Sequence, residues 1–200
     1  MIKMDNKKFY VFTFIFLAVL LISLFREIFL ESKTFGSSDN LSPHATGIAL
    51  NKVADEEEKY PHWQPWVFSG MPTAEAFTNI SQLYFPEYLF KIFSIPGMFI
   101  QISHFLFCGI GMVLLLRYLG CSYWSSFLGS FSFMITPYMV TMLVFGHGSQ
   151  IMTAAYIPWI VMFAIKLWND PKLLNTGILS LLLGFQLQRS HVQIAYYTWL

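Results

Sequence analysis

Long apolar runs separated by short polar segments make up most of this 200-residue chain. A helix that crosses a membrane needs about 20 mostly apolar residues, and several of the runs approach or meet that length. The pattern predicts spanning helices at residues 9–30, 98–119, 123–145, 151–167 and 173–187. The predicted fold class is therefore an all-α polytopic membrane protein built as a bundle of transmembrane helices.

Charged residues at the ends of these runs predict their orientation. Lys3, Lys7 and Lys8 precede the first helix, and the positive-inside rule then places residues 1–8 in the cytoplasm. The apolar core of this helix is longer than that of a signal peptide, and no small-x-small cleavage pattern follows it, so we expect a retained anchor. Counting crossings places residues 31–94, the turn after residue 145 and residues 188–200 outside.

The first outer segment, residues 31–94, is too long for a simple connection and is a functional candidate. Ser42 followed by Pro43 is typical of a helix start and predicts a surface helix at 43–59. A second surface helix is expected at 86–94, beginning near Pro86. The stretch YPHWQPWVFSGMPTAEAF between them predicts an ordered irregular loop at the level of the lipid headgroups.

Within the spans, small residues and a proline predict local features. Ser122, Ser126, Gly129 and Ser130 form a small-residue face suited to close helix contact, and Pro137 predicts a kink. His104 lies inside the second span, where we expect a neutral histidine bonded to a neighbouring helix. Residues 188–200 read as an outer polar cluster and the start of a further helix, so a longer natural chain is expected.

Composition supports a membrane protein and excludes other classes. The chain is 56% hydrophobic, 18% aromatic and 12% charged, against about 25% charged residues in a soluble domain. A net charge of +1 without a basic face gives no basis for nucleic-acid binding. Cys108 and Cys121 have no metal-ligand spacing and read as packing residues. No phosphate-binding loop, dinucleotide fingerprint, zinc-binding helix or nucleophile elbow occurs.

The predicted topology gathers the candidate site residues on the outer side: Asp39, His147, Arg189 and His191. A guanidinium beside a membrane is costly unless an anion pairs with it, and phosphate, either of a substrate or of a lipid headgroup, is the natural partner. His147 lies between two glycines, as a turn residue or a substrate contact. Trp66, with Trp63 and Phe68, either stacks on a sugar or anchors the loop in the interface.

Several segments together resemble the N-terminal region of the bacterial YfhO-type membrane proteins. These segments are SSDNLSP, YPHWQPWVFSGMPT, LYFPEYLF, FGHGSQIMTAAYIPWI and LGFQLQRSHVQIAYYTW, in this order and spacing. The family is related to the integral-membrane glycosyltransferases of the GT-C fold. The resemblance implies a bacterial inner-membrane enzyme that moves a sugar from a polyprenyl-phosphate donor to a cell-envelope glycopolymer acceptor on the outer face.

The resemblance also implies a role for Asp39, which matches the acidic residue that GT-C enzymes carry in the first outer loop. Some of these enzymes use a divalent metal, but this chain offers only Asp39, Glu75 and dispersed histidines as ligands, so no metal site is predicted and no cofactor is certain. His147, Arg189, His191 and Trp66 remain as substrate-binding candidates.

The chemistry of sugar transfer gives a lone carboxylate a use. An acceptor hydroxyl loses a proton as it attacks the anomeric carbon, and a positioned base accelerates such a step by roughly 10²–10⁴. The alternatives are a membrane transporter or flippase, which requires polar residues near mid-bilayer, and a non-catalytic envelope-assembly scaffold. In a scaffold, Asp39 caps the surface helix or pairs with Lys33.

Overall fold

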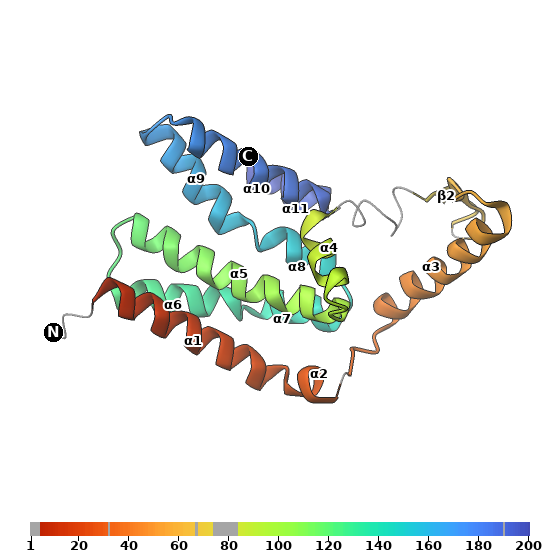
Figure 1. The fold of residues 1–200 in the computed structure, drawn as a ribbon, viewed down its shortest axis with the longest axis horizontal. Helices are drawn as coiled ribbons and strands as arrows, with labels where there is room; N and C mark the ends of the chain where they lie inside the picture. Colours follow the sequence, from red (N-terminus) through yellow and green to blue (C-terminus); the bar gives the residue numbers. More distant parts are fainter. Residues whose placement is uncertain (1–4, 32, 67, 74–83, 190) are drawn as a thin grey trace.

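The computed structural model describes residues 5–31, 33–66, 68–73, 84–189 and 191–200. Lys3, Glu75 and residues 74–77 of the predicted irregular loop lie outside these ranges. The described part is mostly helical (Figure 1). Its helices are α1 Asn6–Leu24, α2 Arg26–Glu31, α3 Ser38–Glu57, α4 Phe85–Ile92, α5 Gly97–Tyr118, α6 Tyr123–Met134, α7 Pro137–Val144, α8 Gly148–Ala154, α9 Ile157–Asn169, α10 Leu173–Gln188 and α11 Val192–Trp199.

In this described part, four segments are long and apolar enough to cross a membrane: Asn6–Leu24, Gly97–Tyr118, Tyr123–Val144 and Gly148–Asn169. The architecture is thus compatible with an all-α membrane protein. The predicted fifth span corresponds to α10, which is apolar but only 16 residues long. Such a helix is shorter than the roughly 20 residues that cross a bilayer without tilt or thinning.

Helix α5 occupies the middle of the bundle. It packs against α1, α6, α8 and α9, and α10 lies along the far side of α9 (Figure 1). Leu17, Phe105, Met134 and Ile151 join these helices in one buried apolar cluster. Cys108 is fully buried in the same cluster, in agreement with the packing role that the sequence predicted.

The contact between α5 and α6 uses the predicted small residues. Ser126 and Ser130 are fully buried, and Ser130 Oγ donates a hydrogen bond of 2.5 Å to the carbonyl oxygen of Gly109. A Cβ placed on Gly129 would lie 2.5 Å from Leu116 Cδ1. Because small residues let helix backbones approach in a medium without water, the serine and glycine face sets this close packing.

Prolines divide the third and fourth spans. The chain leaves the helix at Ile135 and Thr136, directly before the Pro137 at which the sequence predicted a kink, and α7 begins there. Thr136 Oγ accepts a hydrogen bond of 3.4 Å from the backbone N–H of Met139 and so caps the second half. Pro158 lies in the first turn of α9, after a similar break at residues 155 and 156. Proline is compatible with a first turn because it lacks an N–H group.

The first surface helix begins earlier than the sequence predicted. Helix α3 starts at Ser38 with Ser37 as its extended N-cap residue, so Pro43 lies inside the helix and Ser42 is not its cap. Asp39 then falls in the first turn instead of the preceding loop. A carboxylate in a first turn interacts favourably with the positive end of the helix dipole, which favours the earlier start. The second surface helix, predicted at 86–94, is α4.

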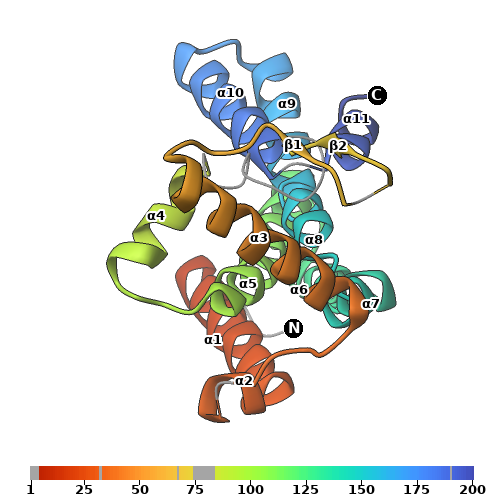
Figure 2. The same ribbon diagram turned by 90° about the vertical axis from the view of Figure 1, so that its right-hand side faces the viewer.

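The loop that the sequence predicted to be irregular contains a small antiparallel hairpin. Strands β1 (Trp63–Gln64) and β2 (Met71–Pro72) pair with Trp63 opposite Pro72. Gly70 has a φ of +113°, and a Cβ there would lie 2.6 Å from the Trp63 indole, so only glycine allows this turn. Helix α3 carries the hairpin beyond one end of the bundle (Figure 1), the end that Figure 2 faces.

Candidate functional site

Three of the predicted site residues lie near one another. Helix α3, which carries one of them, crosses the end of the bundle (Figure 2). Asp39 lies in the first turn of α3, and His147 is the residue before α8. His147 Nε2 lies 3.4 Å from Asp39 Oδ2, although the two residues are more than one hundred positions apart in sequence. His191, the residue before α11, is close enough to His147 for the charges of the two rings to interact.

The Asp39–His147 pair is open to solvent. The Asp39 side chain is 56% exposed and the His147 side chain 46%. An ion pair with this exposure contributes little to folding, because water and salt screen it. Such a pair is available to a ligand, and the histidine can orient the carboxylate. Lys33, the other predicted partner of Asp39, is instead bound by Glu27 and Glu31.

Two glycines hold His147 in position. Gly146 has a φ of +92°, which a residue with a side chain rarely adopts, and His147 N–H donates to the carbonyl oxygen of Met142 at 2.8 Å. A Cβ on Gly148 would lie 2.6 Å from the Gln101 carboxamide, so α8 and α5 approach only because this residue is glycine. The sequence FGHGSQ therefore turns the chain sharply and presents the ring at the bundle end.

His191 has a defined tautomer and is less basic than a free histidine. Its Nδ1 accepts a hydrogen bond of 3.4 Å from the backbone N–H of Ile194, so the neutral ring carries its proton on Nε2. Burial lowers the pKa of His191, and positive charge on His147 lowers it further. A neutral His191 can donate from Nε2 to an anionic group.

Arg189 lies in a different environment from the one the sequence predicted. Its side chain is only 5% exposed, and Nη1 lies 3.5 Å from Glu87 Oε2 of α4. Its guanidinium carbon lies 4.4 Å from the centre of the Tyr84 ring. The expected anionic partner is thus a carboxylate of this chain. Glu87 and Tyr84 were missed in the sequence, where the only signal was an acidic residue one position after a helix-starting proline.

A buried chain of hydrogen bonds adjoins Arg189. His104 Nδ1 donates to the Ile100 carbonyl oxygen at 2.7 Å, so Nε2 accepts from the Tyr84 hydroxyl at 2.9 Å. The Tyr84 hydroxyl in turn accepts from that of Tyr156, at the break between α8 and α9. His104 is thus bonded to a neighbouring element, as its position in a span predicted.

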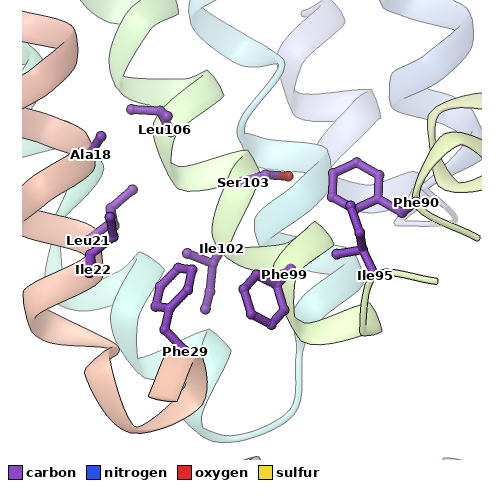
Figure 3. Close-up of a pocket in the computed structure, with 10 residues that line it drawn as sticks. All are labelled: Ala18, Leu21, Ile22, Phe29, Phe90, Ile95, Phe99, Ile102, Ser103 and Leu106. Atoms are coloured by element: carbon purple, nitrogen blue, oxygen red, sulfur yellow. The ribbon is translucent and has the colours of Figure 1, made fainter. Parts of the chain in front are cut away.

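Two apolar cavities lie beneath α4. The first, of about 400 Å³, is lined by Tyr84, Phe90, Phe107 and Phe185 among others. The second, of about 290 Å³, lies between α1, α4 and α5 and is drawn in Figure 3. Phe90 and Ser103 line both, so the two cavities are neighbours beneath α4. Such linings fit a hydrocarbon chain and offer few partners to a polar ligand.

Trp66 does not join the cluster. It lies half-exposed in the turn after β1, outside the contacts that join Asp39 to His147 and Arg189 to Glu87. Metal ligands do not converge either: among the described residues no group of three or more histidine, cysteine, aspartate or glutamate side chains could hold a metal ion.

Comparisons with protein-family models, curated proteins and solved structures find no match to this chain.

Proposed function

We propose that this chain belongs to a GT-C-like membrane glycosyltransferase that moves a sugar from a polyprenyl-phosphate donor to a cell-envelope glycopolymer on the outer face of a bacterial inner membrane. The observation that carries the proposal is the meeting of Asp39 and His147, 3.4 Å apart at one end of the bundle. Two chemically active groups from distant segments, both solvent-exposed and close to one another, favour a reaction site over a packing contact.

In this proposal Asp39 is the base. Its carboxylate accepts the proton of the acceptor hydroxyl as that oxygen attacks the anomeric carbon of the donor sugar. His147 orients the carboxylate through Nε2. One carboxylate supports a single displacement, so the anomeric configuration inverts.

The leaving group is a lipid phosphate that departs as an anion. The reaction therefore needs hydrogen-bond donors or positive charge at the phosphate, and no second carboxylic acid. The candidate donors are His147, which contacts the proposed base, and His191, which lies near His147. His191 also lies close to the buried Arg189 along the chain, since it follows Arg189 by two residues.

A scaffold without catalytic activity is the competing proposal. It is favoured by the place of Asp39 in the first turn of α3, where a carboxylate stabilises a helix with or without catalysis. The two proposals differ in what a neutral, isosteric side chain does at this position.

The test is Asp39→Asn in the full-length protein, assayed in membranes for transfer from a polyprenyl-phosphate sugar. Asparagine keeps the shape and much of the helix-start preference but removes the base, so we expect transfer to fall by roughly 10²–10⁴. Asp55→Asn, near the other end of α3, is the matched control and should leave transfer unchanged. Undiminished transfer by Asp39→Asn would exclude the base and leave the scaffold.

The sidedness of the site has a separate test. A single cysteine at position 39 should react with a membrane-impermeant maleimide added outside the cell. Reaction only after the cytoplasmic side is opened would contradict the outer-face site.

A further inference from the structure

Glu87 is shared between two cations. Its Oε2 lies 3.5 Å from Arg189 Nη1, and its Oε1 lies 3.4 Å from Lys91 Nζ, one turn further along α4. In these contacts one carboxylate faces two positive charges. The carboxylate can move fully onto Lys91, which is half-exposed, and leave Arg189 for another anion.

Arg189 has unused hydrogen-bonding capacity. In the part of the chain that the structure describes, the buried Nε and Nη1 atoms make no well-formed hydrogen bond, and Glu87 lies 3.5 Å from Nη1. Buried donors without acceptors cost free energy, and this cost is highest for charged groups. A phosphate, which accepts two parallel N–H bonds from a guanidinium, would satisfy these donors.

The larger apolar cavity begins at the same place. Tyr84, on whose ring the Arg189 guanidinium lies, is one of its walls. Its other walls come from α4, α5, α10 and the break before α9, and α5 and α9 are parts of candidate spans. In a bilayer the surroundings of these spans are hydrocarbon, so the occupant available to this cavity is a lipid chain.

We propose that Glu87 gates a binding site for a lipid-borne phosphate, with the phosphate displacing the Glu87 carboxylate from Arg189 and the lipid chain entering the cavity beneath α4. The chemistry is shared by two sources, a polyprenyl phosphate and an anionic phospholipid of the bilayer. That this lipid is the sugar donor rests on the proposed function, whereas its binding does not.

A gate and a purely structural ion pair predict opposite effects of Glu87→Gln on the affinity for lipid phosphate. In Glu87→Gln the competing charge is removed, so lipid phosphate should bind more tightly, by roughly threefold to tenfold. In Arg189→Gln the phosphate partner is removed, and affinity should fall by about tenfold or more. If the pair served only to hold α4 in place, both substitutions would weaken binding together.

A third variant tests the cavity without touching charge. Ser103 lines both cavities, and its hydroxyl donates to the Ile100 carbonyl oxygen of its own helix. Ser103→Leu fills the space with a residue that suits both a helix and a lipid environment, and should weaken binding of the chain. The matched control for Arg189→Gln is Lys33→Gln, which removes a different cation, one paired with Glu27 and Glu31. It should leave the affinity for the lipid unchanged.

The experiment measures binding to the purified full-length protein in detergent, without acceptor or turnover. The probes are undecaprenyl phosphate, phosphatidylglycerol and undecaprenol, which lacks the phosphate. Tighter binding of a phosphate lipid to Glu87→Gln, with weaker binding to Arg189→Gln, supports the gate. Stronger binding of undecaprenyl phosphate identifies a donor-type source, and stronger binding of phosphatidylglycerol a bilayer source.

Two results would overturn the inference. One is equal affinity for undecaprenol and undecaprenyl phosphate, which would remove the phosphate from recognition. The other is weaker binding by Glu87→Gln at an unchanged thermal midpoint. Because no sugar is transferred in this assay, a failure here is distinct from a failure of Asp39→Asn to lose transfer.

Discussion

Two polar clusters lie toward the same end of this bundle and differ in solvent access. The first, Asp39 with His147 and His191, is exposed to half-buried and includes a contact of 3.4 Å between acid and base. The second joins Tyr84, His104 and Tyr156 in a buried chain of hydrogen bonds, with Arg189 stacked on Tyr84.

The difference separates stability from reactivity. Buried polar groups that bond one another fix the position of α4 on α5 and α9. Each lost hydrogen bond leaves a buried polar group without its partner, which lowers the stability of the fold. Exposed charges contribute little to folding but can meet a substrate. Arg189 is intermediate, since it is buried like the second cluster yet keeps unsatisfied donors among the described residues.

The largest effect on folding is expected where packing supports the buried cluster. Trp159 stacks on Phe107, which contacts Tyr156, and a Cβ on Gly111 would lie 2.4 Å from Trp159 Nε1. Gly111→Ala should therefore displace the indole, break its hydrogen bond to the Phe107 carbonyl oxygen and cost roughly 3 kcal/mol. Thermal unfolding in detergent measures this loss.

Gly177→Ala in α10 is the control for the helix effect of the same substitution. Nothing lies within 4 Å of the Cβ it would gain, so it should stabilise the helix by about 0.5–1 kcal/mol. If both alanines had the same effect, close packing around Trp159 would not support the buried cluster.

A smaller effect should distinguish the two clusters directly. Tyr84→Phe leaves His104 Nε2 and the Tyr156 hydroxyl without their partner and should cost about 2 kcal/mol of folding stability. His147→Gln should leave the thermal midpoint unchanged and reduce sugar transfer, because an exposed pair contributes little to folding. The comparison fails if His147→Gln destabilises the protein as much as Tyr84→Phe does.

The apolar pattern was sufficient to predict the four helices of the described part that are long and apolar enough to cross a membrane, because hydrophobic length is a local property of the chain. The kink at Pro137 and the small face of α6 follow from local chemistry in the same way. The predicted start of α3 was wrong because Ser37 and Ser42 both suit the N-cap position. The choice between them depends on the interaction of Asp39 with the helix dipole.

The candidate site was predictable only as a set of residues on one side. The number of predicted membrane crossings assigned Asp39, His147 and His191 to the same side of the membrane. The pairing of Asp39 with His147 depends on how α3 crosses the bundle end, which the sequence does not show. The burial of Arg189 against Glu87 was missed because the pairing joins α4 to the end of α10, about one hundred residues away, and no local pattern encodes it.

The smallest effect concerns pH and tests whether the exposed cluster is electrostatically connected. Burial, and secondarily charge on His147, lower the pKa of His191, so protonation is opposed in the folded protein. The unfolded chain takes up the proton first as pH falls through the ordinary histidine range near 6.5. Stability contributed by neutral His191 is therefore present above that range and is lost as pH falls toward the lowered pKa.

His191→Asn should remove this part of the acid destabilisation. Between pH 7 and pH 5 the free energy of unfolding of the variant should fall by less than that of the unchanged protein, with a difference of about 1 kcal/mol or less. The thermal midpoint should fall less in the same way. His147→Gln should also flatten the curve, by a smaller amount, because removing a positive neighbour raises the pKa of His191. Identical pH curves for His147→Gln and the unchanged protein would mean that the two rings do not interact. Asp39 and His147 would then be an isolated pair, and His191 could not assist a phosphate at the same site.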